Sequence, residues 1–561
     1  MPRRSGSDFF SSGPFNLTGL ALAVMGPNAT GYAVGSDQTF TSSLVRVSIN
    51  GHPYSVPDPR EIGWTDPIDF AITAGLNVPL VLDDMETSRG ISNGQTTWFA
   101  KGDQTFLGEL DQGIEELGTY FLSGPTFYVP YNMRLFSLFG VASTSVLAAV
   151  LPERDADRWV DLWTVAPFII DGPSGVPSPY NDTSGGVLAN TTIRQTVRPS
   201  HDASEIKFQL SNFFSTGPLV IQHLSVAHAL PNASGVSLGQ GLIDVPTSKD
   251  ITFDGGQSGI TIQPGDIIET DPVDFRVIQD RDYSLSMFLG QGQSHNITGH
   301  FWGETAWFLG GDQTSAPNFS QNGGAEQIGT YFLAAIEGKV NAEAIVALGD
   351  STTDRAGTDI DTYVGWTDDL AVRIQNDPST RHLTVNNAGI GANTVFHLPS
   401  VGEPAVDRLQ RDVLNQAGVK YCIVFEGVND IGSQNDTEIE GPTSPSTILN
   451  GVIDGYKSII ERLHAQGIKA IGATITPFHK PAYATGLNFY YTPGREQTRL
   501  KINEWIRTPG NYDAFFDFSA VVTNASNPIQ MADRYASADF LHPGPEGYKA
   551  IAESIDLNVF H

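Results

Sequence analysis

The stretch Ala344-Ile-Val-Ala-Leu-Gly-Asp-Ser-Thr-Thr-Asp354 decides how the second half of the chain folds. Its apolar run, residues 344–348, predicts a buried strand of a parallel sheet, which ends at Gly349. In open α/β sheets, ligands bind just beyond the carboxyl ends of the strands. Ser351 lies on a tight turn at this edge and is therefore a candidate nucleophile, although turn serines without a catalytic role are common.

Three further polar blocks follow in the C-terminal half of the chain. They are Asn387-Ala-Gly-Ile-Gly-Ala-Asn393, Glu426-Gly-Val-Asn-Asp430 and Asp539-Phe-Leu-His-Pro543. The first two come directly after strand-like apolar runs, residues 383–387 and 421–425. In order and spacing, the four blocks resemble those of the SGNH (GDSL-type) hydrolase family, and the resemblance covers about residues 342–561. One block alone would be a weak signal, whereas four in the same order are specific.

The region 342–561 alternates strand patterns with helical patterns, which predicts a parallel sheet with helices on both faces. The resemblance implies that this α/β domain has the three-layer, flavodoxin-like fold of the family. Helices are expected at residues 363–375, 406–416, 447–466, 495–507 and 545–555, and further strands at 468–475 and 514–518.

Serine-dependent ester hydrolysis also requires a base that activates the hydroxyl. His542 is the candidate base, because a neutral imidazole can accept the hydroxyl proton near pH 7. Asp539, three residues earlier, can orient the imidazole and stabilise its cation. The resemblance implies that Ser351, His542 and Asp539 form the catalytic triad.

The tetrahedral oxyanion needs hydrogen-bond donors. The resemblance assigns this role to the Ser351 backbone N–H, the Asn429 side chain and a backbone N–H of the second block. Family members usually have glycine at the last position of N-x-x-x-x-G, where this chain has Ala392. We assign the third donor to Ala392, with Gly391 as the alternative. Because the added Cβ can tilt the amide or narrow the pocket, a slow enzyme is one expectation.

The first 340 residues contain one β pattern twice. Matched motifs include Ser7–Pro14 with Ser211–Pro218, Trp98-Phe with Trp307-Phe, and Leu117–Leu122 with Ile328–Leu333. The offset between the copies drifts only from 204 to 211 residues along these pairs. Such a repeat indicates two copies of one module. Trp98 and Trp307 are either stacking platforms for sugar rings or core aromatic residues.

The two copies are unequal. The strand-like segments 191–197 and 205–210 are expected to form a hairpin at the start of the second copy, and the first copy lacks both. We therefore expect residues 158–340 to form a complete β-sandwich module and residues 1–132 a truncated one, with an exposed edge. The complete module resembles the β-sandwich that precedes the hydrolase domain in some secreted family members.

Residues 133–157 form an apolar linker that resembles an internal signal peptide. Met133-Arg134 is followed by 17 uncharged residues, whereas residues 1–14 contain no such apolar run. A buried linker helix or a marginal membrane span would give a similar pattern. We hypothesise that residues 1–132 are the tail of a duplicated neighbouring module, fused to a protein that starts at Met133. N-terminal sequencing of the secreted protein tests this, and a mature chain that begins before Met133 would refute it.

Composition narrows the set of partners and compartments. The formal net charge of −30 argues against nucleic acid and anionic membrane surfaces as partners. Cys422 is the single cysteine, so no internal disulfide is possible. Nine N-x-S/T sequons are compatible with a secreted glycoprotein; they start at Asn16, Asn28, Asn181, Asn190, Asn232, Asn296, Asn318, Asn435 and Asn524. No motif indicates a metal or a cofactor, and the sequence does not indicate an oligomeric state.

The sequence thus predicts a secreted serine ester hydrolase that forms an acyl-enzyme, with a small-molecule or glycan ester as its substrate. Carbohydrate O-deacetylation and lipase-like activity are both open, and no stable membrane insertion is expected. The alternative is a glycan-binding protein whose hydrolase domain is weak or inactive. A third interpretation keeps the serine chemistry but transfers the acyl group to an alcohol.

Overall fold

The computed structural model describes residues 157–396, 400–486 and 488–561, together with the backbone of six short strands between residues 15 and 99. The chain divides into two compact units, Met1–Ala149 and Val150–His561. In the first unit, strands pair antiparallel as β1 (Phe15–Leu17) with β4 (Phe70–Ile72), β2 (Arg46–Ile49) with β3 (His52–Ser55), and β5 (Ser88–Ser92) with β6 (Gln95–Phe99). The other predictions for residues 1–156 lie outside the described residues.

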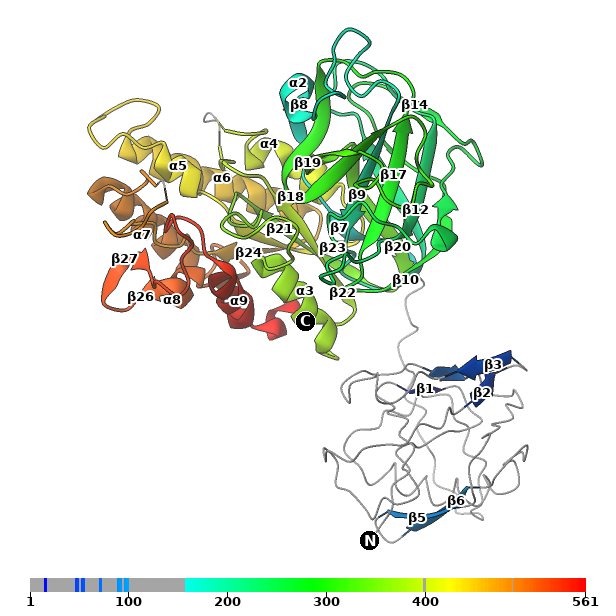
Figure 1. Ribbon diagram of the computed structural model, residues 1–561. Coiled ribbons are helices and arrows are strands. Elements are labelled where there is room, and N and C mark those ends of the chain that lie inside the picture. The colour runs from blue at the N-terminus through cyan, green and yellow to red at the C-terminus, as the bar shows by residue number, and fades with distance from the viewer. Residues whose placement is uncertain are drawn as a thin grey trace. The chain divides into compact units, whose positions relative to one another are not determined.

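Residues 158–340, here called the β region, contain two antiparallel sheets (Figure 1). One has the order β15 (Ile267–Glu269), β10 (Ala203–Ser211), β20 (Leu333–Val340) and β7 (Arg158–Thr164), and β16 (Val273–Val277) also pairs with β10. The other has the order β13 (Lys249–Asp250), β12 (His223–His228), β17 (Tyr283–Leu289), β9 (Thr191–Val197), β18 (Asn296–Gly310) and β19 (Ala325–Tyr331), and β8 (Phe168–Asp171) also pairs with β18. Smaller elements are the pair β11 (Leu219–Ile221) and β14 (Ile260–Ile262), α2 (Gly172–Gly175) and η1 (Val245–Thr247).

The predicted hairpin at the start of this region is wrong. Strands β9 and β10 exist as expected, but β9 pairs with β17 and β18, whereas β10 belongs to the other sheet. Residues 198–202 carry the chain between the sheets, and there the N–H and hydroxyl of Ser200 both donate to the Leu162 carbonyl. Because both strands bury apolar residues in one core, alternation alone cannot distinguish strands that pair from strands that face each other.

Residues 342–561, here called the α/β region, contain a five-stranded parallel sheet. Its order is β22 (Leu383–Gly389), β21 (Glu343–Gly349), β23 (Val419–Phe425), β24 (Lys469–Ala473) and β25 (Ala514–Phe516). The remaining pair is β26 (Thr523–Asn524) with β27 (Asn527–Met531). The helices are α3 (Trp366–Asn376), α4 (Ala405–Leu409), η2 (Gln410–Leu414), α5 (Val428–Gly432), α6 (Pro445–Ala465), α7 (Pro493–Arg507), α8 (Phe518–Val522), α9 (Pro545–Ser554) and η3 (Leu557–Phe560).

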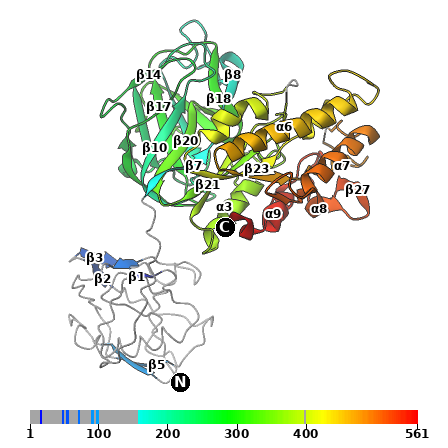
Figure 2. The same ribbon diagram turned by 180° about the vertical axis from the view of Figure 1, so that it is seen from behind.

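Helices cover both faces of this parallel sheet (Figures 1 and 2). Ile345 and Ala347 of β21 pack in one core cluster with α3, α8 and α9. Their neighbours Ala344, Val346 and Leu348 point into a second cluster with α4, α6 and α7. The continuous apolar run therefore serves two faces, as expected for a central parallel strand.

The predicted helices are present with small shifts at their ends, but two details differ. Helix α4 continues as the π-helical turn η2, and the last predicted strand stops at Phe516, before α8 begins. The sequence reading did not include the short helix α5, which carries the Gly427-Val-Asn-Asp430 motif. In the described ranges, no helix is both long and apolar enough to cross a membrane.

The β region and the α/β region share a core. The second cluster extends from β-region residues such as Val160 to Val346 and Leu348 of the parallel sheet. Strand β7 also bonds to the edge strand β22, since the Asn386 amide donates to the Asp161 carbonyl over 3.1 Å. The two regions therefore pack as one body, and this packing positions the site described next.

Candidate active site

The structure brings Ser351, His542 and Asp539 together beyond the carboxyl end of β21. The Ser351 Oγ lies 2.8 Å from the His542 Nε2, and the His542 Nδ1 lies 2.8 Å from the Asp539 Oδ2. Ser351 and His542 are partly exposed, so a substrate can reach them. The arrangement can relay a proton from the hydroxyl to an imidazole that a carboxylate orients.

The Asp539 carboxylate is fixed by several donors. Its Oδ1 accepts the N–H groups of Leu541 and His542 at 2.8 and 3.0 Å, and the Ser537 hydroxyl at 2.8 Å. Burial raises the pKa of Asp539, but the hydrogen bonds and charge of His542 and the backbone donors outweigh it and hold the pKa below its usual range. The ionised carboxylate therefore keeps the proton on Nδ1 and leaves Nε2 as an acceptor.

Asn429 lies in the first turn of α5 and is almost fully buried. Its Nδ2 donates to the Asn393 carbonyl over 2.8 Å, and its Oδ1 accepts the Tyr490 hydroxyl over 2.7 Å. An amide nitrogen carries two protons. Within residues 157–396, 400–486 and 488–561, no acceptor takes the second one, so it can serve a substrate oxyanion.

The structure distinguishes between the two candidates for the third donor. The Gly391 N–H already donates to the Asp354 Oδ2 over 3.2 Å. The N–H of Ala392 has no acceptor in the part of the chain that the structure describes. Ala392 is therefore the better candidate, and Gly391 is a support beside it. Ala392 has a φ of +59°, in the left-handed region, where glycine is favoured over alanine.

Ala392→Gly should stabilise the protein by about 0.5–1 kcal/mol, because glycine avoids the left-handed penalty of about 1–2 kcal/mol but loses more backbone entropy. We expect kcat for an ester to be equal or higher, since the amide aligns with less strain. Denaturant midpoints at a constant m-value measure the stability. Gly391→Ala is the matched control, because its Cβ would lie 3.8 Å from the nearest atom and should bring no gain. A variant Ala392→Gly that is less stable than the wild type would contradict the argument.

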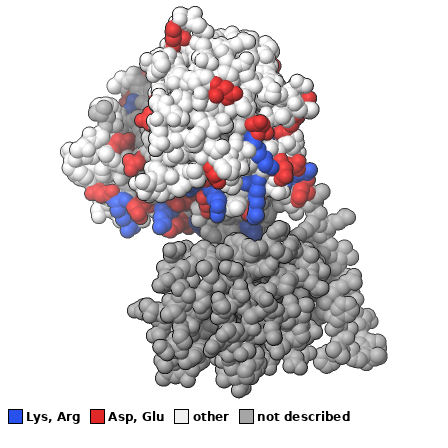
Figure 3. Space-filling view, turned by 45° about the vertical axis from the view of Figure 1, so that its right-hand side comes forward, with Lys and Arg blue, Asp and Glu red and all other residues white. Residues whose placement is uncertain are grey.

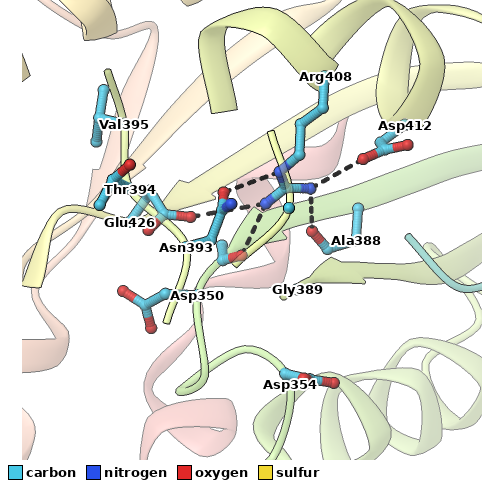
Figure 4. Close-up of polar contacts among 12 residues, drawn as sticks. Asp350, Asp354, Ala388, Gly389, Asn393, Thr394, Val395, Arg408, Asp412 and Glu426 are labelled. Atoms are coloured by element: carbon cyan, nitrogen blue, oxygen red, sulfur yellow. Dashed lines mark hydrogen bonds and ion pairs between the residues drawn. The ribbon is translucent and has the colours of Figure 1, made fainter. Parts of the chain in front are cut away.

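Arg408 connects the ends of two strands and the Asn387–Asn393 block through hydrogen bonds, and sequence reasoning missed it (Figure 4). This fully buried side chain donates to the Asn393 Oδ1 at 2.9 Å, the Ala388 carbonyl at 2.8 Å and the Gly349 carbonyl at 2.9 Å. It also pairs with Asp412 and Glu426. One guanidinium thus ties together the ends of β21 and β22 and the second block. A single arginine in a helical pattern gives no signal for such a role.

The loop between β24 and α7 holds two of the site residues. Asn488 donates to the carbonyls of Asp539 and Phe478 at 2.9 and 3.0 Å, and Tyr490 donates to Asn429. The sequence analysis assigned no motif to this loop. Asn488 and Tyr490 contact backbone carbonyls and the Asn429 side-chain amide. Such contacts depend on tertiary packing, so the sequence gives no sign of them.

Three buried acids lie beside the site. Burial raises the pKa of Asp350 to about 6 and that of Asp430 to about 7, despite backbone donors. Burial, together with the Asp350 charge, raises the pKa of Glu426 well above its usual value. The folded protein therefore holds protons that the unfolded chain, with ordinary carboxyl pKa values near 4, has already released.

Stability should consequently fall as pH rises from about 4 to about 7, because the folded state binds more protons than the unfolded state in this window. The contribution of Asp430 is on the order of 4 kcal/mol, since its pKa rises from about 4 to about 7. Tm at pH 5 should exceed Tm at pH 8. Asp430→Asn keeps an acceptor for the Val395 N–H and should flatten the profile. A Tm that rises with pH would contradict this prediction.

Comparisons with known proteins show which family and which solved structures the chain resembles. The GDSL-like lipase/acylhydrolase family model matches residues 347–550, and a search of curated proteins found no match. Similar solved structures include a GDSL-like lipase from Bacteroides thetaiotaomicron, with 18% identity over 39% of this chain and 88% of that chain and a TM-score of 0.27. Another is the acetylxylan esterase Axe2 from Geobacillus stearothermophilus, with 19% identity over 39% and 93% and a TM-score of 0.29. Residues 347–550 thus form a GDSL-like lipase/acylhydrolase domain, and the protein is a hydrolase of the esterase type.

Proposed function

We propose that this protein is a secreted serine carboxylesterase that works through an acyl-enzyme on Ser351. The observation that carries the proposal is the continuous hydrogen-bonded array of Asp539, His542 and Ser351. Among the described residues, one amide proton of Asn429 in α5 and the backbone N–H of Ala392 have no acceptor. Together these groups supply the nucleophile, the base and the donors that ester hydrolysis requires.

The proposed course follows from this geometry. The Ser351 Oγ attacks the ester carbonyl while the His542 Nε2 accepts its proton. The N–H groups of Ser351 and Ala392 and the amide of Asn429 stabilise the oxyanion. His542 then donates its proton to the departing alkoxide, which leaves as the alcohol. Water, deprotonated by His542, attacks the acyl-enzyme, and His542 returns this proton to the Ser351 Oγ as the acid leaves, which restores the free enzyme.

The substrate that we propose is a small-molecule or glycan ester with a short acyl group. A panel that spans acetylated glycans and acyl chains from C2 to C12, with p-nitrophenyl acetate as the reference, tests this. Turnover that is lost in both Ser351→Ala and His542→Ala supports the esterase. Glycan binding without turnover supports the rival binding function, and product esters formed with added alcohols would indicate acyl transfer.

We also propose the three-layer, flavodoxin-like arrangement for the α/β region and a β-sandwich for the β region. Chain-order strand positions 2-1-3-4-5 and the core clusters on both sheet faces support the first. The two antiparallel sheets around a common core support the second. Strands β20, which ends at Val340, and β21, which starts at Glu343, support the domain boundaries 158–340 and 342–561.

Secretion remains a proposal as well. None of the sequon asparagines in the described residues is buried, so each can carry a glycan: Asn181, Asn190, Asn232, Asn296, Asn318, Asn435 and Asn524. On the face drawn in Figure 3, Lys and Arg gather along one edge among acidic side chains, and acidic side chains are scattered elsewhere. That face therefore offers no continuous basic patch for nucleic acid.

A further inference from the structure

Strand β18 of the β region is interrupted by a bulge between His300 and Thr305, where its register with β19 shifts. Trp302 has φ of +147° and Gly303 has φ of +92°. Such a backbone costs energy in any residue other than glycine, and residues in such conformations cluster at functional sites. Strand pairing alone does not explain why the backbone adopts this strained conformation at Trp302.

The bulge contacts the segment that directly follows the nucleophile. The His300 Nε2 lies 3.0 Å from the Asp354 Oδ1, and the Glu304 Oε1 lies 2.6 Å from the Arg355 guanidinium. The side chain of Asp361 accepts the N–H and hydroxyl of Thr305 at 2.7 and 2.8 Å. All three partners lie within ten residues of Ser351 in the sequence. The β region thus holds the segment that follows Ser351, residues 354–361, through polar contacts with these three residues.

His300 is buried, and each of its ring nitrogens lies within hydrogen-bond distance of an oxygen atom. Its Nδ1 lies 2.8 Å from the Ala166 carbonyl and its Nε2 faces the Asp354 carboxylate, so both neighbours are acceptors. Glu304 is the other charged group that acts on it, and the Phe168 ring packs against its edge. Burial lowers the pKa of His300, but the pairing with Asp354 outweighs this and raises it. His300 and Asp354 therefore form a buried ion pair between the regions.

Asp354 also contacts the segment that contains Gly391 and Ala392. Its second oxygen, Oδ2, accepts the Gly391 N–H, and the next residue, Ala392, offers the candidate oxyanion donor. A buried carboxylate that loses its cationic partner is costly and seeks other donors. Removal of the His300 cation should therefore shift the Asp354 carboxylate, displace the Gly391 N–H that it holds and misalign the neighbouring Ala392 amide.

The first copy of the β pattern provides an internal comparison. The second copy reads His300-Phe-Trp-Gly-Glu-Thr-Ala-Trp307, and the matching stretch of the first reads Ile91-Ser-Asn-Gly-Gln-Thr-Thr-Trp98. Glycine, one threonine and tryptophan recur, but isoleucine and glutamine replace His300 and Glu304. Only the copy that precedes the hydrolase domain has the two ionisable residues. The pattern links these side chains to the catalytic domain rather than to the β fold.

We propose that the β region is a working part of the esterase site, in which His300 is a positioning residue that sets the Ala392 donor through Asp354 and Gly391. This proposal rests on the proposed esterase function. It differs from a passive or glycan-binding role, because it makes catalysis depend on a side chain of the β region that touches neither substrate nor nucleophile.

The test compares His300→Phe with His300→Gln in the full chain. His300→Phe removes both donors and should lower kcat for p-nitrophenyl acetate about 10- to 100-fold with KM nearly unchanged, since a shifted donor weakens the transition state more than substrate binding. His300→Gln can still donate to Asp354 and should restore most of kcat. Asp354→Asn combined with His300→Phe should cost little more than either change alone.

Glu337→Gln is the matched control, because it weakens the pair with Lys207 in the sheet of the β region that does not contain β18 and its bulge. It should lower stability without lowering kcat. Hydrogen exchange of residues 387–396 provides a readout that does not need turnover, and it should accelerate in His300→Phe but not in Glu337→Gln. A folded His300→Phe with wild-type kcat and exchange would overturn the proposal. A wild type without any esterase activity would refute the proposed function instead, and the exchange result would still decide whether His300 holds the loop.

Discussion

Ser351→Ala should abolish ester hydrolysis, with kcat for p-nitrophenyl acetate about 10⁵- to 10⁶-fold lower, the size of loss seen when a triad nucleophile is removed. Without the hydroxyl, His542 has no proton to accept and no acyl-enzyme can form. Residual catalysis would come only from the oxyanion donors. The change removes one partly exposed oxygen, so Tm should stay near that of the wild type.

Steady-state kinetics and covalent labelling check this prediction together. A fluorophosphonate should add to Ser351 of the wild type, as located by mass spectrometry, and should not label Ser351→Ala. Ser379→Ala, which alters an exposed hydroxyl bonded to Asp377, is the control and should retain full activity. More than a tenth of wild-type turnover in Ser351→Ala would exclude this serine as the nucleophile.

The sequence alone could predict that two of the principal site residues lie close together, because parallel strands end at the same edge of a sheet. Ser351 follows β21 and Asn429 follows β23, so strand prediction alone places them at the same edge. His542 and Asp539 follow no strand of this sheet, and only their resemblance to a known block linked them to the other two.

The supporting residues could not be predicted, for a physical reason. Arg408, Tyr490 and His300 each act through polar contacts with residues that are distant in the sequence. A single polar side chain on a helix, loop or strand leaves no periodic signature, and its partner depends on packing. The prediction of a hairpin between β9 and β10 was wrong for a related reason. Strands that pair and strands that face each other across a core show the same alternation of apolar and polar residues.

Asp539→Asn should lower kcat about 10⁴-fold while leaving the fold intact, a loss typical of a wrongly oriented triad imidazole. The orientation of the new amide is dictated by its neighbours. Leu541, His542 and Ser537 all donate to Oδ1, so the amide oxygen must take that place. The NH₂ group then faces the His542 Nδ1 and forces it to accept, which moves the ring proton to Nε2, where it blocks transfer from Ser351.

This argument separates a tautomer effect from simple loss of support. Asp539→Asn should stay folded with a somewhat lower Tm, because every backbone donor retains an acceptor but the ionised carboxylate is lost. ¹⁵N NMR should show the His542 ring proton on Nε2. Ser537→Ala removes one donor to the same carboxylate without changing the tautomer, so it should cost far less activity. Turnover of Asp539→Asn within tenfold of wild type would mean that the carboxylate does not set the tautomer. His542 would then depend for its orientation on packing alone.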